Sequence, residues 1–479
     1  MLIGKYYPTM DGAAHLYNSN IINELLWSGN ELFEAFFKFN DLFVPNWIGH
    51  FILSLFNLFL PAFLAEKILL LCYLIGLPFS FRFFIKSVAP ENVAYSYLIF
   101  PFCYTFPFIL GFYNFSLAII LMLITFNYWQ TKFNNFSPKQ SFILFSLFTL
   151  TFFSHVFVFI LVLFLISLHI LFSALHDYTC RAKKMKILLK ETGRRAWFIL
   201  KTAFIPLSFF GFYFISTINL ERSYTFLGAD KLIDWIEKVR PIIAYNANIE
   251  SVYTDKIFYI ILTLFILSLY ERINTTLNEV RPAGKRKLNL EVKHILKKSD
   301  FWLLSVVLIA VFYFILPNSD QVAGFFSVRF ALLLFILLIT WLSTQKIRRW
   351  VIWFSIIFVI YFNLRLNVYY AQVIKDLNNV AVNCEKAAAH IEPNSIVLPI
   401  NNSDNWLAGH FSNYLGVNKP IVILENYELA TGYFPLEWKN KSIPNLLLGD
   451  HASGSLSCPP WKTNKNNSKK AIDYVFVLG

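Results

Sequence analysis

Long, nearly unbroken apolar runs recur along most of this chain, with short connections between them. A membrane-spanning helix needs about 20 apolar residues, and several runs reach or approach that length. Overall, 57% of the residues are apolar and 15% are charged, whereas soluble domains are about 25% charged. This composition excludes an ordinary soluble enzyme. It predicts an all-α polytopic membrane protein of about ten or eleven transmembrane helices, with runs at 48–65, 68–85, 93–112, 114–129, 141–153, 156–175, 197–218, 257–270, 301–317, 330–344 and 351–368.

The net charge of +13 is concentrated in three connections between the apolar runs. Residues 176–196 carry a net +5, residues 271–300 a net +4, and residues 346–349 a further +3. Cytoplasmic loops of membrane proteins carry such an excess of Lys and Arg. The charge is therefore explained by membrane topology, and we expect no nucleic acid among the partners.

The last part of the chain, residues 369–479, has a different composition. It contains nine Lys or Arg and nine Asp or Glu, and it is rich in turn-forming residues. Counting outward from the basic connections places it on the extracytoplasmic side of an inner membrane. We predict a first extracytoplasmic loop at 1–46, a transmembrane domain at 47–368 and a small α/β domain at 369–479. Cys384 and Cys458 lie in that domain, although two cysteines do not establish a disulfide.

The number of crossings before residue 176 must be odd if residues 1–46 are also extracytoplasmic. The apolar runs in that region number six. We favour one long helix over 141–175 that extends beyond the bilayer. The alternative is a re-entrant run, which is permitted only where it is buried in protein or lines a cavity.

The most informative polar segment precedes the first apolar run. Pro8 and Thr9 suit the start of a helix, and Asp11 near that N-terminus is favoured by the helix dipole. Asp11 and His15 are four residues apart, so on a helix they share a face. The apolar residues that follow predict an amphipathic helix on the membrane surface. The simpler alternative is that Asp11 caps the helix and His15 hydrogen-bonds locally, since no metal-ligand spacing such as HExxH accompanies them.

This segment resembles the first extracytoplasmic loop of bacterial membrane glycosyltransferases of the GT-C fold. That group includes the protein O-mannosyltransferase-like and aminoarabinose-transferase-like proteins. The layout of many spans followed by a small C-terminal extracytoplasmic domain is similar as well. The fragments that carry the resemblance are Pro8-Thr9-Met10-Asp11-Gly12-Ala13-Ala14-His15-Leu16-Tyr17, Pro45-Asn46-Trp47 with His50, Ala65-Glu66-Lys67, and Gly111-Phe112-Tyr113-Asn114-Phe115.

The resemblance implies transfer of a sugar from a polyprenyl-phosphate carrier, a membrane lipid, to a hydroxyl of a glycan, lipid or protein acceptor outside the membrane. It implies that Asp11 is the general base, which takes the proton of the acceptor hydroxyl. No nucleotide-sugar site is needed, and the sequence has no Rossmann or P-loop fingerprint. We predict neither a cofactor nor a metal ligand, and leave a divalent cation open. A helix normally precedes this loop in the group, so either this sequence lacks a first helix or the first apolar run serves as an uncleaved signal.

Five further residues are candidate substrate-binding positions. Arg329 opens an apolar run at the outer surface, where a guanidinium can hold a phosphate through two hydrogen bonds. Its alternative role is snorkelling from a helix end. His50 lies in an apolar run, and its alternative role is that of a hydrogen-bonded packing residue. The remaining candidates, all from the first loop, are His15, Tyr17 and Asn18.

Other polar residues have weaker claims. Asp41 is a possible second acid or an ordinary loop residue, and Glu66-Lys67 is most simply a solvated turn. The C-terminal domain contains aromatic, amide and acidic residues of the kinds that bind sugars. The same residues suit packing of the domain onto a membrane surface, and we favour this second role. These are Trp406, His410, Asn413, Tyr414, Glu425-Asn426-Tyr427-Glu428 and Gly432-Tyr433-Phe434-Pro435.

Two other functions compete with glycosyl transfer. A transporter or flippase of lipid-linked substrates would show charge pairs at mid-membrane or broken helices repeated in two halves. We find no internal repeat, and the spans are poor in acids. The third candidate is a catalytically inactive scaffold that keeps the GT-C-like fold.

Overall fold

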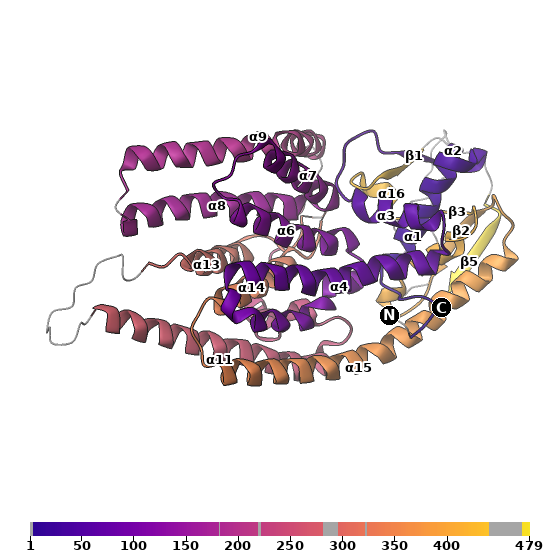
Figure 1. Ribbon diagram of the computed structural model, residues 1–479. Helices are drawn as coiled ribbons and strands as arrows, with labels where there is room; N and C mark the ends of the chain where they lie inside the picture. Colours follow the sequence, from indigo (N-terminus) through magenta and orange to yellow (C-terminus); the bar gives the residue numbers. More distant parts are fainter. Residues whose placement is uncertain (1–2, 182, 219–221, 281–295, 321–322, 440–471) are drawn as a thin grey trace.

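A computed structural model describes residues 3–181, 183–218, 222–280, 296–320, 323–439 and 472–479. Long helices run side by side through most of the molecule, while the strands and both termini lie at one end, here called the strand end (Figure 1). The opposite end, here called the basic end, carries Arg181, Lys183, Lys298 and Lys346. The helices of this body are α3 (Trp47–Asn57), α4 (Ala62–Val88), η2 (Pro90–Cys103), α5 (Phe106–Leu110), α6 (Tyr113–Thr131), α7 (Pro138–Ser154), α8 (Val156–Arg181), α9 (Met185–Thr217), α11 (Ala247–Val280), α13 (Asp300–Ile315), α14 (Phe326–Ser343) and α15 (Arg349–Ala387).

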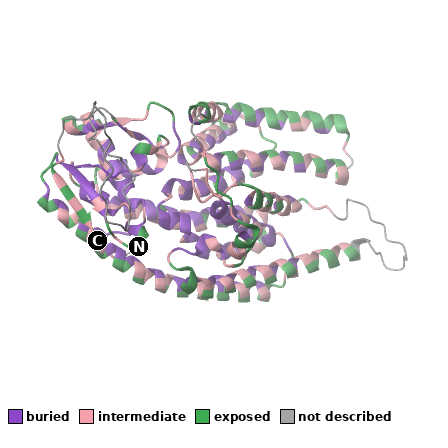
Figure 2. Cartoon of the chain, turned by 180° about the vertical axis from the view of Figure 1, so that it is seen from behind, coloured by how far each residue is buried: buried purple, intermediate pink, exposed green. Residues whose placement is uncertain are grey.

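Within the described residues, seven helices are long and apolar enough to cross a membrane: α4, η2 continued into α5, α8, α9, α11, α14 and α15. The helices α3 and α13 are apolar but shorter. Buried residues gather where helices face one another, and exposed residues cover the outer helices (Figure 2). The fold is therefore that of a polytopic helical protein with a small α/β region.

The chain passes between the two ends five times before Arg181, through α4, η2 with α5, α6, α7 and α8. The number of passes is odd because the first apolar run forms α3, which does not count as a pass. With 11 residues, α3 is only about 16 Å long and too short to cross a membrane. The long helix expected over 141–175 is wrong, because the backbone of His155 is extended and separates α7 from α8. There, the hydroxyl of Ser154 donates a hydrogen bond to the carbonyl of Asn114 at 2.8 Å.

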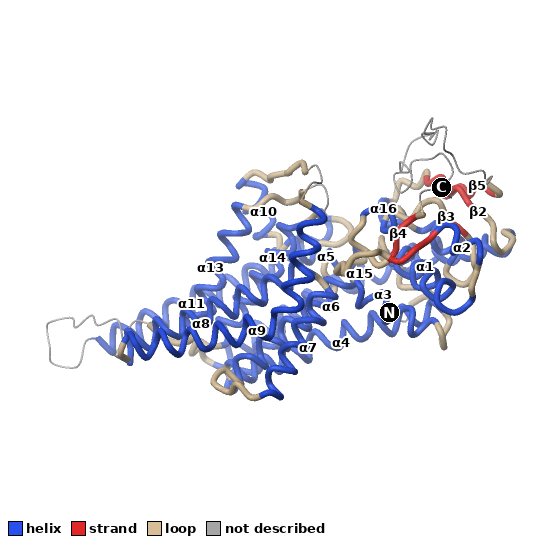
Figure 3. The backbone as a smooth tube through the Cα atoms, turned by 90° about the horizontal axis from the view of Figure 1, so that it is seen from above, coloured by secondary structure: helices blue, strands red, loops and turns tan. Residues whose placement is uncertain are grey.

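The strand end combines the beginning and the end of the chain. Its central strand β2 pairs in parallel with β3 and β5, and β1 from the first loop pairs antiparallel with β4 (Figure 3). The helix α15 runs through the expected boundary at residue 368 and ends against this unit. Cys384 is buried in α15, and Cys458 lies outside the described residues. The elements here are α1 (Gly12–Asn23), η1 (Glu24–Ser28), α2 (Glu31–Phe36), β1 (Phe37–Phe39), η4 (Ala388–His390), β2 (Ile396–Asn401), η5 (Trp406–Ala408), η6 (Phe411–Gly416), β3 (Val422–Ile423), α16 (Glu428–Thr431), β4 (Leu436–Trp438) and β5 (Tyr474–Leu478), with α10 (Ala229–Glu237) and η3 (Arg240–Ile242) following α9 along the chain.

The helix α1 does not lie on the membrane surface as an amphipathic helix. Nearly all its residues from Gly12 to Ile22 are buried, because α3 covers one side and η6 another. Two of its amide side chains, Asn18 and Asn20, donate hydrogen bonds to Glu428 and to the Gly416 carbonyl in the C-terminal part of the chain. The apolar pattern predicted the helix correctly, but its surroundings depended on residues about 400 positions later.

Candidate functional site

A cavity of about 540 Å³ opens at the strand end, between helix ends and the C-terminal segment. It is lined mainly by aromatic and apolar side chains from α5, α6, α8, α9 and α14. Its ionisable residues come from distant parts of the sequence: Asp11, His15, His155, Arg222, Asp320, Arg329 and His410. Of the predicted site residues, the cavity therefore brings together Asp11, His15 and Arg329.

Asp11 is held in the cavity wall by its own backbone. The amides of Met10 and Asp11 donate to the carbonyls of Ile109 and Leu110 at 3.1 and 3.0 Å. Next to this contact, Gly111 has φ +95°, and a Cβ placed there would lie 2.7 Å from the Cβ of Asp11. Only glycine permits both this conformation and this approach.

The carboxyl group of Asp11 is buried, with 5% of the residue exposed. Burial raises its pKa to about 6, against the opposing effect of His410 and His15. Asp11 precedes α1 but makes no side-chain capping bond there, so the capping alternative does not describe its side chain. A carboxyl group with a pKa near neutrality is suited to exchanging protons.

His410 connects Asp11 to a second buried acid. Its Nε2 lies 3.7 Å from Asp11 Oδ1, and its Nδ1 lies 2.6 Å from Glu425 Oε1. Burial lowers the pKa of His410, but Glu425 and then Asp11 outweigh it and bring the value to about 9. The ring of Tyr427 stacks on the imidazole at 4.5 Å. The sequence favours packing onto a membrane surface for these residues, whereas the structure places His410, Tyr427 and Tyr433 in the cavity lining.

A second ionisable cluster lies next to Asp11 and consists of His15, His50 and Glu428. Nδ1 of His15 is 2.7 Å from Glu428 Oε1, and Nε2 of His50 is 2.7 Å from Glu428 Oε2. The two histidine nitrogens are 3.3 Å apart. All three residues are buried. Burial lowers the pKa of His15, but Glu428, Asp11 and the Gly111 carbonyl together outweigh it and raise the pKa to about 9. The two histidines hold the pKa of Glu428 below its usual range, against the effect of burial.

Tyr17 and Asn18 do not line the cavity. The Tyr17 hydroxyl donates to the carbonyl of Ile421 and accepts from the amide of Ile423, so it ties α1 to β3. Asn18 donates to Glu428 Oε2 at 2.6 Å. His50 also lies behind the cavity wall, in contact with Glu428 rather than with the open space.

Arg329 is buried in the first turn of α14 and does not snorkel outward. Its guanidinium stacks over Phe112 at 4.8 Å and approaches His155 Nε2 at 3.4 Å. Among the described residues, no carboxylate forms an ion pair with it, and its Nε has no hydrogen-bond partner. Nearby, Arg222 and Asp320 form an ion pair of 3.0 Å at the cavity.

Glu66 is fully buried rather than part of a solvated turn. It lies in the first two turns of α4 and accepts a hydrogen bond from the Tyr113 hydroxyl at 2.9 Å. That hydroxyl also meets the Thr9 hydroxyl at 2.7 Å. A Cβ at Gly12 would lie 2.6 to 2.7 Å from these three side chains. Asp41, in contrast, is exposed and pairs with Lys38.

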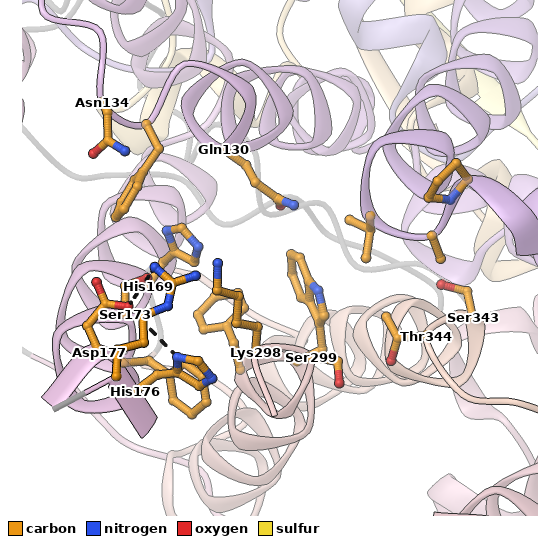
Figure 4. Close-up of a pocket in the computed structure, with 18 of the residues that line it drawn as sticks. Gln130, Asn134, His169, Ser173, His176, Asp177, Lys298, Ser299, Ser343 and Thr344 are labelled. Atoms are coloured by element: carbon orange, nitrogen blue, oxygen red, sulfur yellow. Dashed lines mark ion pairs between the residues drawn. The ribbon is translucent and has the colours of Figure 1, made fainter. Parts of the chain in front are cut away.

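A separate cavity of about 720 Å³ lies at the basic end (Figure 4). The helices α6, α8 and α14 contribute their N-terminal ends to the first cavity and their C-terminal ends to this one. Figure 4 shows His169, His176, Asp177 and Lys298 around it. Its acidic lining residues are Glu91 and Asp177, and Asp177 is paired with Lys183 at 3.1 Å.

Comparisons of this chain with known protein families, curated proteins and solved structures found no match. Sequence reasoning did not place His410, Tyr427 and Tyr433, which line the cavity, or Glu425 and Glu428, which contact its histidines, in the site. No spacing connects them to Asp11 or His15, because they reach the first loop only through the tertiary fold.

Proposed function

We propose that this protein is a glycosyltransferase that moves a sugar from a polyprenyl-phosphate carrier to an acceptor hydroxyl. The observation that carries the proposal is that a buried carboxyl, Asp11, and a buried guanidinium, Arg329, which has no carboxylate partner within the described part of the chain, line one largely apolar cavity at the end of the long helices. An apolar lining suits a lipid carrier, and a guanidinium suits its phosphate.

In this mechanism, the acceptor oxygen forms a bond to the anomeric carbon of the sugar while the bond from that carbon to the carrier phosphate breaks. Asp11 takes the proton of the acceptor hydroxyl, which its pKa near 6 permits at neutral pH. Arg329 balances the charge left on the polyprenyl phosphate. His410 positions Asp11 and is in turn held by Glu425.

The cell-envelope location belongs to the same proposal. Lys and Arg residues cluster at the basic end, which is the charge distribution of a cytoplasmic face. The strand end, with Asp11 and the C-terminal segment, then lies outside an inner membrane. The acceptor is a glycan, lipid or protein on that side, and nucleic acid has no part in it.

The test is a transfer assay in membranes supplied with radiolabelled polyprenyl-phosphate sugars. Asp11→Asn should abolish transfer, since the amide cannot take the proton, while the protein still inserts and folds. Asp41→Asn, at an exposed acid of the same loop, should transfer normally. Equal transfer by wild type and Asp11→Asn would contradict the proposed base, and bound carrier without turnover in wild type would favour the inactive scaffold.

A lipid-linked substrate transporter is the second candidate. It is favoured by the two cavities at opposite ends of α14, about 27 Å apart along that helix of 18 residues. Reconstituted protein that moves a labelled polyprenyl-phosphate sugar across vesicles, equally well with Asp11→Asn, would support this function instead.

A further inference from the structure

We propose that His15, His50 and Glu428 form a binding site for a divalent transition-metal ion, and that Zn²⁺ is the ion that suits it. The three side chains come from α1, α3 and α16, and their ligand atoms all lie within 4.8 Å of one another. Two imidazoles and one carboxylate are a ligand set that protein zinc sites use. This proposal is independent of the glycosyltransferase proposal.

In each histidine, the ring nitrogen that faces away from Glu428, here called the outer nitrogen, already contacts a backbone carbonyl. His15 Nε2 lies 2.8 Å from the carbonyl of Gly111, and His50 Nδ1 lies 3.0 Å from the carbonyl of Asn46. A carbonyl only accepts hydrogen bonds, so each of these nitrogens carries the ring proton. Metal-binding histidines are oriented in the same way, with the second nitrogen donating to a backbone carbonyl or a carboxylate.

The inner nitrogens therefore carry lone pairs in the neutral rings. His15 Nδ1 and His50 Nε2 face each other at 3.3 Å and both face the carboxylate of Glu428. Acceptors that meet in a buried space need a donor or a cation between them. The arrangement is satisfied either by extra protons on both rings or by one metal ion bound to all three groups.

The surroundings of the Glu428 carboxylate favour a metal ion over extra protons on the rings. Glu428 Oε1 is buried and accepts no hydrogen bond from any described residue. His15 Nδ1 is its nearest cationic neighbour, at 2.7 Å. Glu428 Oε2 is anchored from behind by Asn18, whose own oxygen accepts from Asn426. Oε1 therefore has no hydrogen-bond donor among the described residues and lies beside His15, where a metal ion would bind it.

The distances are close to those of a tetrahedral site. With bonds of about 2.0 to 2.1 Å, two ligands of zinc lie roughly 3.3 Å apart, which is the separation of the two histidine nitrogens. The two distances to Glu428 are shorter, at 2.7 Å. The carboxylate would therefore move back by several tenths of an ångström when the ion binds. The site would join the first loop to α16, next to the cavity that His15 lines.

The experiment measures metal in the full chain, purified in detergent through a tag that contains no histidine. The protein is stripped with EDTA, reloaded with Zn²⁺ and freed of excess metal before its zinc content is determined. We expect about one equivalent per chain. His50→Gln and Glu428→Gln should bind at least about tenfold more weakly, while His390→Gln and Glu392→Gln, exposed residues near the end of α15, should bind as wild type does.

A second measurement keeps the test decisive if a ligand variant does not fold. Wild-type protein loaded with Co²⁺ should show the visible absorption of a tetrahedral site, and Zn²⁺ should displace it and raise the unfolding temperature. Wild type that takes up no zinc and shows no such absorption would overturn the proposal in favour of protonated histidines. Equal zinc content in wild type and in folded ligand variants would overturn it as well.

Discussion

The Nε2 atom of His410 lies 3.7 Å from the Oδ1 atom of Asp11, although one residue belongs to the first loop and the other to the C-terminal segment. This contact joins two parts of the chain that the whole membrane region separates. It also gives Asp11 a cationic neighbour inside an apolar cavity, so the charge of its carboxylate is balanced there.

The pairing of His410 with Glu425 should make stability depend on pH. Glu425, Asp11, Glu428 and Tyr427 face His410, and the acids raise its pKa from 6.5 to about 9 against the effect of burial. This raised pKa stabilises the folded state by up to about 3 kcal/mol. The stabilisation is fully present below about pH 6.5 and is lost as the pH rises through about 9. Wild type should therefore melt well above His410→Gln at pH 6 and lose most of that margin at pH 10. An unchanged margin would contradict the pairing, and exposed His390→Gln provides the control.

Gly111→Ala should disturb the site through the approach of Asp11. The substituted Cβ would meet the Asp11 Cβ at 2.7 Å in a backbone with φ +95°. We expect a loss of about 1 to 3 kcal/mol in unfolding free energy, together with loss of transfer activity. Gly29→Ala is the matched control, because Gly29 also has a positive φ, of +60°, but has no atom within 4 Å of its added Cβ. Equal effects of the two substitutions on unfolding temperature would assign the whole cost to backbone conformation.

Tyr113→Phe should destabilise the protein by about 1 to 3 kcal/mol, because it leaves buried Glu66 and Thr9 without a partner. The control is Tyr128→Phe on the same helix, whose hydroxyl forms no hydrogen bond with another described residue. Thermal unfolding in one detergent compares the two variants. A Tyr128→Phe variant as destabilised as Tyr113→Phe would show that the hydrogen bonds of Tyr113 are not the cause.

Arg329→Lys should weaken binding of the carrier more than it slows the chemical step. An ammonium keeps the charge but cannot hold a phosphate through two parallel hydrogen bonds. We expect KM for the polyprenyl-phosphate sugar to rise about tenfold with a smaller change in kcat. Arg349→Gln, at the exposed start of α15, should leave both constants unchanged. A fall in kcat alone would place Arg329 in transition-state stabilisation rather than in binding.

The apolar runs predicted a polytopic helical fold, because hydrophobic segments must find apolar surroundings wherever they lie in the chain, but the described residues contain seven helices long and apolar enough to cross a membrane rather than ten or eleven. They were less reliable at the boundaries. Two runs at 48–65 and 68–85 looked equivalent, yet one forms a short helix and a turn, and the other continues a long helix that begins at Ala62. The break at His155 was also missed, since a single extended residue between two apolar helices leaves no change in hydropathy.

The sequence by itself determined that Asp11 directly precedes a helix that contains His15, because that depends only on neighbouring residues. It also singled out Arg329 as a charge at the end of an apolar run. Only the tertiary structure decided which groups surround them: Glu428 and Glu425 come within hydrogen-bond distance of His15 and His410 through the packing of α1 and α3 against the C-terminal segment. The physical reason is that burial and charge pairing arise between elements far apart in the chain, so spacing along the sequence carries no record of them.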